Sequence, residues 1–150
     1  MDMPAEREPQ GSLETGALGE AKYDIIVVDD DPAMRSGMRQ VLTAAGYGVG
    51  EAANGTEVLA LLARASTRLV ITDIFMPNSD GLEVIQILLR RNVPVIAMSG
   101  APHFEVGLFQ RVSLHLGARA ALQKPFSDTE LLQRVTTEIG PPGSRRQGGA

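Results

Sequence analysis

Cysteine is absent from this 150-residue chain, and so is any long apolar run. Without cysteine, disulfides and cysteine-based metal sites are excluded, and we expect an intracellular, cytoplasmic protein. No apolar stretch approaches the ~20 residues that a membrane-spanning helix needs, so we expect no membrane insertion. The N-terminus also lacks the apolar segment of a signal peptide.

A strong excess of one charge is also missing. The net charge is −4 and the basic residues are scattered, which argues against direct nucleic-acid binding. The glycine-rich phosphate loops G-x-x-x-x-G-K-[ST] and G-x-G-x-x-G are absent, as is a Ser/His/Asp set. The chain therefore offers no visible cradle for a nucleotide.

The length suits one domain with a substantial core. Residues 1–21 and 140–150 are polar or rich in glycine and show no sustained apolar period. Such segments bury too little apolar surface to offset the entropy of ordering the chain. We therefore predict one domain over residues 22–139, flanked by two disordered tails.

Within the predicted domain, short apolar runs alternate with helical patterns, which indicates an α/β fold with a parallel sheet covered on both faces. The predicted strands are 24–29, 49–52, 69–73, 93–98 and 120–123. The predicted helices are 32–45, 54–62, 80–90, 104–116 and 127–139, several of which begin at N-cap residues such as Asp31, Asn54 and Ser127. Right-handed crossovers would build a doubly wound five-stranded parallel sheet, in the order 2-1-3-4-5 of the flavodoxin-like fold.

Polar residues follow the predicted strands where they end. Asp29 ends the first predicted strand and Asp30 follows it, Asp73 ends the third, Ser99 follows the fourth and Lys124 follows the fifth. In the predicted order these ends share one rim, so three carboxylates would meet there. At about 6 Å they would repel by about 3 kcal/mol per pair at an effective dielectric near 20. Oxygen ligands of this kind suit Mg²⁺, which also bridges to phosphate oxygens.

The same rim suits the chemistry of a single phosphoryl group. A carboxylate that attacks a phosphoryl group forms an acyl phosphate. Lys124 and Ser99 offer an ammonium and a hydroxyl to further phosphate oxygens. Phe75, in the loop after Asp73, offers only its backbone carbonyl to a metal.

Four short motifs carry a family resemblance. They are VVDDDP at 27–32, TDIFMPNSDG at 72–81, MSGA at 98–101 and KPF at 124–126. Together, in this order and at strand ends, they resemble the receiver domain of two-component response regulators. The resemblance covers roughly residues 23–139 and implies that Asp73 accepts a phosphoryl group from a sensor histidine kinase or a histidine phosphotransfer protein.

The resemblance also implies the roles of the other rim residues. Asp29 and Asp30 would hold Mg²⁺ together with Asp73 and the Phe75 carbonyl. Ser99 would be the switch hydroxyl, and Lys124 would contact the phosphate.

A receiver would be a switch for partner binding, and not an enzyme beyond self-catalysed phosphoryl transfer and slow autodephosphorylation. Its partner-binding surface would combine the helix 104–116, the strand 120–123 and the helix 127–139, and we expect a stand-alone receiver because few residues follow Ile139. The downstream target is not evident, and the sequence leaves open whether the domain forms a homodimer, regulates a partner or relays phosphate.

Three positions depart from the family pattern or affect the lifetime of the phosphoryl group. Ala121 stands where family members commonly place an aromatic residue that follows the switch hydroxyl, so the usual coupling cannot operate unchanged. Phe75 and Ala101 offer no polar side chain to position an attacking water. We therefore expect a long-lived aspartyl phosphate.

Two alternative functions remain open from the sequence. A phosphatase resembling the haloacid dehalogenase superfamily would use Asp29 and Asp31 with Ser99 and Lys124, but it would leave Asp73 without a role. A degenerate receiver that binds a partner without phosphorylation is the other alternative, because the aromatic is missing at 121.

Overall fold

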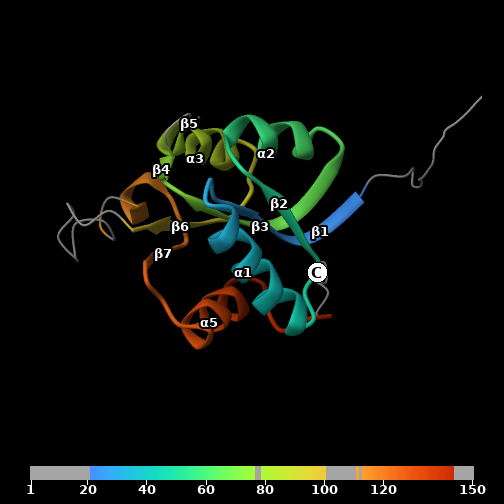
Figure 1. The fold of residues 1–150 in the computed structure, drawn as a ribbon. Helices are drawn as coiled ribbons and strands as arrows, with labels where there is room; N and C mark the ends of the chain where they lie inside the picture. Colours follow the sequence, from blue (N-terminus) through green and yellow to red (C-terminus); the bar gives the residue numbers. More distant parts are fainter. Residues whose placement is uncertain (1–20, 77–78, 101–110, 112, 144–150) are drawn as a thin grey trace, which may run out of the picture.

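The computed structural model describes residues 21–76, 79–100, 111 and 113–143, with the backbone alone for 75–82 (Figure 1). Its main sheet has five parallel strands in the order β2-β1-β3-β6-β7. These strands are β1 (Ala21–Val28), β2 (Val49–Ala52), β3 (Ala65–Asp73), β6 (Val95–Ser99) and β7 (Ala120–Gln123). In chain order this is 2-1-3-4-5, so the predicted doubly wound sheet is confirmed.

Helices cover both faces of the sheet. They are α1 (Pro32–Ala44), α2 (Gly55–Leu62), α3 (Gly81–Arg90) and α5 (Asp128–Ile139). Figure 1 shows α1 and α5 against one face and α2 and α3 against the other. Alternate residues of β1 therefore enter two separate cores: Ile25 and Val27 pack toward α1 and α5, while Ile26 and Val28 pack in the opposite core.

The predicted N-caps determine where three helices begin. The Asp31 carboxylate accepts from the N–H groups of Ala33 and Met34 at the start of α1. Asn54 and Ser127 cap α2 and α5 in the same way. Each side chain pairs a helical N–H that would otherwise lack an acceptor, so local sequence alone places these boundaries.

The structure corrects several predicted bounds. β1 and β3 begin earlier than expected because Ala21–Tyr23 pair with Ala65–Thr67 at the entry to the sheet. The fourth strand of the sheet begins at Val95 and not at residue 93, because the Val93 N–H still pairs with the Leu88 carbonyl at the end of α3.

The segment after Asp73, expected as a loop, contains a short antiparallel hairpin. It consists of β4 (Phe75–Met76) and β5 (Ser79–Asp80). Strands of two residues are too short to show an alternating pattern in the sequence. The turn residues of this segment therefore predicted a loop and gave no indication of the hairpin.

The predicted helix 104–116 lies largely outside the described residues. Residues 113–116 are helical, and Gly117 follows them with a φ of +111°, as expected for a glycine that ends a helix.

The predicted boundaries of the domain and of its tails stay predictions. Gly140, the first residue of the predicted C-terminal tail, accepts a hydrogen bond through its carbonyl from the Tyr47 hydroxyl at 2.7 Å.

Within the described residues, no helix is both long and apolar enough to cross a membrane.

Candidate functional site

The carboxyl ends of β1, β3, β6 and β7 bring the predicted site residues to one rim. Asp29 follows β1, Asp73 ends β3, Ser99 ends β6 and Lys124 follows β7. Parallel register aligns the ends, since Asp73 pairs with Met98 and Ser99 pairs with Gln123. Because the strands are parallel, side chains far apart in the sequence share this rim.

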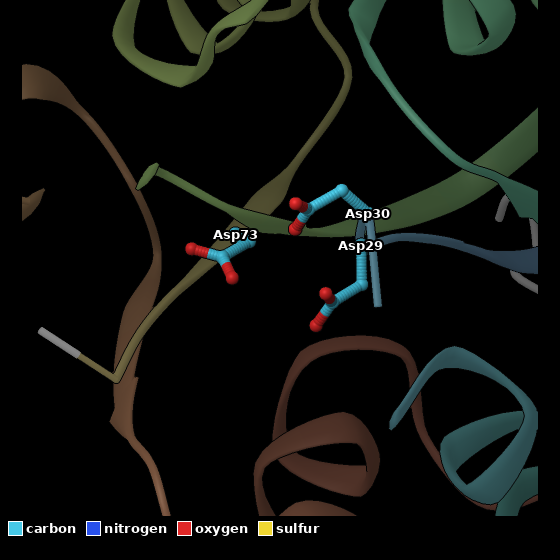
Figure 2. A group of neighbouring side chains, drawn as sticks. All are labelled: Asp29, Asp30 and Asp73. Atoms are coloured by element: carbon cyan, nitrogen blue, oxygen red, sulfur yellow. The ribbon is translucent and has the colours of Figure 1, made fainter. Parts of the chain in front are cut away.

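Asp29, Asp30 and Asp73 form a carboxylate cluster. Each contributes an oxygen that lies within 4.8 Å of the others. Figure 2 shows the three side chains turned toward a shared space beyond the ends of β1 and β3. Asp29 and Asp73 are buried whereas Asp30 is exposed, so the cluster borders solvent on one side. An oxygen-only set of this kind fits Mg²⁺, which retains water ligands beside one or two carboxylates.

Lys124 is the cation of the cluster. Its Nζ donates to Asp29 Oδ2 at 2.8 Å and to Asp73 Oδ2 at 2.7 Å. Burial would lower the pKa of Lys124, but the hydrogen bonds to Asp29 and Asp73 and their negative charges outweigh it and raise that pKa above its ordinary value. The ammonium therefore stays charged at neutral pH and neutralises part of the carboxylate repulsion.

Gly100 allows the Lys124 side chain to reach the cluster. A Cβ at residue 100 would lie 3.2 Å from Lys124 Cδ and 3.4 Å from Lys124 Cβ. The residue after Ser99 therefore has to be small for the lysine stem to pass in its present position.

Asp31 does not join the cluster. Its side chain accepts from two N–H groups of α1, and its own N–H donates to Asp29 Oδ1 at 2.9 Å. The phosphatase alternative needs the carboxylates of Asp29 and Asp31 beside one metal. The observed pair is instead Asp29 with Asp30, so the structure does not form the arrangement that this alternative requires.

The roles of three further residues stay predictions. Ser99 is fully buried at the end of β6, where a switch hydroxyl is expected. Phe75 begins β4, two residues after Asp73, and its side chain lies outside the description. Ala101 also lies outside the described residues. Ala121 is buried in the core on the α2 and α3 face, and no aromatic ring stands at that position.

Sequence reasoning missed Arg35. Its guanidinium Nη1 donates to the backbone carbonyl of Asp29 at 2.7 Å. The only signal in the sequence is an arginine one turn into the helix that follows the acidic residues, and that pattern alone does not show where the side chain points.

Comparison with known proteins decides the family. The model of the response regulator receiver domain matches residues 25–136 of this chain. The chain belongs to the response regulator receiver family. Receiver domains of this family act in two-component signalling, so the resemblance drawn from the four motifs is confirmed.

Curated relatives are regulatory proteins. The regulatory protein VirG of Agrobacterium tumefaciens is 34% identical over 122 residues, which cover 81% of this chain and 45% of VirG. The response regulator MprA of a Mycobacterium species is 38% identical over 114 residues, covering 74% of this chain and 48% of MprA. The receiver chain thus spans about half the length of these relatives.

Solved structures agree with the receiver fold. The receiver domain of NtrX from Brucella abortus gives a TM-score of 0.70 at 27% identity, covering 77% of this chain and 97% of the other. The chemotaxis protein CheY4 of Vibrio cholerae gives a TM-score of 0.69 at 26% identity, covering 81% and 100% of the two chains.

Proposed function

We propose that this receiver takes a phosphoryl group from a phosphohistidine onto Asp73 and thereby changes its affinity for a partner. The observation that carries the proposal is the Asp73 carboxylate, which ends β3 beside two other acids and 2.7 Å from the Lys124 ammonium. The donor is a sensor histidine kinase or a histidine phosphotransfer protein, and the setting is the cytoplasm.

The transfer replaces one bond to phosphorus with another. An oxygen of Asp73 forms the new O–P bond while the N–P bond to the donor imidazole breaks, so the phosphohistidine returns to histidine. Lys124 turns its ammonium toward an oxygen of the transferred group, and Ser99 donates its hydroxyl to another. Receiver and donor together need no outside oxidant or reductant.

Asp29, Asp30 and Asp73 would hold Mg²⁺, with the Phe75 carbonyl as a further ligand. The bound cation supplies positive charge that neutralises the phosphoryl oxygens as negative charge spreads over them. The carboxylate count supports this assignment, because three carboxylates face the single Lys124 ammonium and a formal negative charge is left for a further cation.

The partner-binding surface is proposed to lie over the predicted helix 104–116, of which the structure describes 111 and 113–116, together with β7 and α5. Leu114 lies on this surface and is 51% exposed, which is unusual for a large apolar side chain within the described residues. Because residue 121 is alanine, no aromatic ring can turn inward there when Ser99 moves toward the phosphate. Other contacts therefore have to transmit the movement of Ser99 to this surface.

The proposal is tested by intact-protein mass after incubation with Mg²⁺ and acetyl phosphate. We expect a gain of one phosphate in the wild type and in Asp31→Asn, whose carboxylate caps α1. Asp73→Asn and wild type with EDTA should show no gain. Phosphate on Asp73→Asn would place the acceptor elsewhere, and an unmodified wild type would favour a receiver that binds its partner without phosphorylation.

The lifetime of the phosphoryl group is followed in the same samples after the donor is removed. Because residues 75 and 101 are Phe and Ala, we expect the added mass to persist beyond minutes. Loss within seconds would contradict this expectation, and it would leave the assignment of Asp73 as acceptor intact.

A further inference from the structure

Arg35 links the second strand of the sheet to the acidic cluster. In addition to its bond to the Asp29 carbonyl, its Nε donates to Glu51 Oε1 at 3.0 Å. Glu51 lies in β2, and its other oxygen pairs with Arg39 Nε at 2.6 Å. Arg39 lies one turn further along α1 than Arg35. One guanidinium therefore ties Glu51 to the end of β1.

The carbonyl that Arg35 holds belongs to the peptide unit between Asp29 and Asp30. This unit is planar, so a fixed oxygen fixes the orientation of the whole plane and the direction in which Asp30 leaves it. The Asp29 N–H is held separately by the Ala52 carbonyl at 3.2 Å. The Asp29 carboxylate is held by Lys124 and by the Asp31 N–H. Arg35 therefore holds the oxygen of the peptide from which Asp30 leaves, separately from the groups that hold the Asp29 N–H and carboxylate.

We propose that Arg35 is a positioning residue of the Mg²⁺ site. It holds the Asp29–Asp30 peptide so that the Asp30 carboxylate faces the cation beside the carboxylate of Asp29, and Glu51 orients the Arg35 guanidinium. This inference rests on the proposed function, because it takes Asp29 and Asp30 to be metal ligands. An arginine suits the task, since the planar guanidinium carries donors in a fixed fork that can reach two acceptors at once.

The positive charge of Arg35 affects Mg²⁺ affinity in the opposite sense to its positioning contact. A nearby positive charge repels Mg²⁺, so loss of the charge, considered by itself, would strengthen metal binding. Removal of a positioning contact would weaken metal binding. Arg39→Gln is the matched control, because it removes the same charge and a pair with Glu51 while the Asp29 contact remains. The sign of the change in affinity therefore separates the two effects.

The test is a Mg²⁺ titration of the full chain labelled with ¹⁵N and followed by two-dimensional NMR, with wild type, Arg35→Gln and Arg39→Gln compared. We expect Arg35→Gln to bind Mg²⁺ about tenfold more weakly than wild type, as is typical when a partner of a metal ligand is lost. Arg39→Gln should bind with wild-type affinity or slightly tighter. Equal or tighter binding by Arg35→Gln would overturn the inference.

Two further readouts exclude a general loss of structure. Both glutamine variants lose a pair with Glu51, and Arg35→Gln also loses its hydrogen bond to the Asp29 carbonyl. We therefore expect the urea midpoint of Arg35→Gln to be the lower of the two, while both variants stay fully folded without urea. Arg35→Lys should give an intermediate affinity, because a single ammonium replaces the two separate donors that reach Asp29 and Glu51. A tenfold loss of affinity that only accompanies partial unfolding of Arg35→Gln would contradict the positioning role.

Phosphorylation assays at several Mg²⁺ concentrations distinguish a failure of this inference from a failure of the proposed function. At saturating Mg²⁺, Arg35→Gln should gain phosphate on Asp73 as wild type does, so that the Mg²⁺ requirement alone changes. If wild type takes phosphate and both proteins need the same Mg²⁺ concentration, the positioning role fails and the proposed function stands. If wild type binds Mg²⁺ but never gains phosphate, the proposed function fails, and the affinities still decide the role of Arg35. Absence of Mg²⁺-dependent shifts in wild type overturns the inference.

Discussion

Lys124 is the residue on which the metal-free cluster depends, because one ammonium serves two buried carboxylates. Lys124→Met leaves Asp29 and Asp73 without this partner, and we expect the metal-free protein to lose about 3 kcal/mol of unfolding free energy. Mg²⁺ supplies the missing positive charge, so added Mg²⁺ should stabilise the variant more than the wild type. Urea unfolding with and without Mg²⁺ measures both effects.

Lys22→Met is the control, because Lys22 is the other lysine of the chain and is exposed. Alkaline pH gives a second check on the same pairs. Since the pKa of Lys124 is raised in the folded protein, its contribution is fully present below the unfolded pKa of about 10.5 and is lost as the pH rises through the higher folded value. Stability lost above that pH in Lys22→Met but not in Lys124→Met would support this account, whereas equal losses would contradict it.

At the scale of elements, two glycines show how helix ends and helix interiors differ. Gly117 has a φ of +111°, and a Cβ there would lie 2.9 Å from Leu89 Cδ1 on α3. We expect Gly117→Ala to lower the unfolding free energy by more than about 1 kcal/mol, because alanine is strained in that conformation. Gly37 lies within α1 and a Cβ there meets nothing within 4 Å. Gly37→Ala should therefore stabilise the protein by about 0.5–1 kcal/mol. Thermal unfolding of both variants tests the contrast, and the same sign for both changes would refute it.

The sequence predicts well the helices and strands whose bounds are set by residues close to them in the chain. β2 and β7 have the predicted bounds, and β7 is a short apolar run that ends at Gln123 before Lys124 and Pro125. α5 begins where Ser127 caps it. The early start of β3 was not predictable, because it depends on pairing with a strand some forty residues away in the chain. The acidic cluster followed from strand order, whereas the Arg35 contact depends on a side-chain direction that no spacing encodes.

At the scale of the whole molecule, the acidic cluster and one structural anchor lie at opposite ends of the parallel strands. The site occupies the carboxyl ends of the strands. Toward the amino ends of the strands, two hydrogen bonds hold the end of α5. Arg68 Nη2 donates to the Ile139 carbonyl at 2.6 Å, and the Tyr47 hydroxyl donates to the Gly140 carbonyl at 2.7 Å. Arg68 also pairs with Asp24 of β1 at 3.5 Å. These contacts fix the end of α5 to the sheet without touching the acidic cluster.

Changes at the end of α5 should therefore lower the free energy of unfolding and leave the rate of phosphorylation unchanged. Tyr47→Phe removes the hydrogen bond to Gly140 from a nearly buried ring, and we expect a loss of about 1 kcal/mol in unfolding free energy. Tyr23→Phe, which removes the other tyrosine hydroxyl of the chain, is the matched control and should cost less. Both variants should gain phosphate at the wild-type rate in the acetyl phosphate assay. A slower rate in Tyr47→Phe, measured where the protein is fully folded, would show that the two ends of the sheet are coupled through α5 and would contradict their separation.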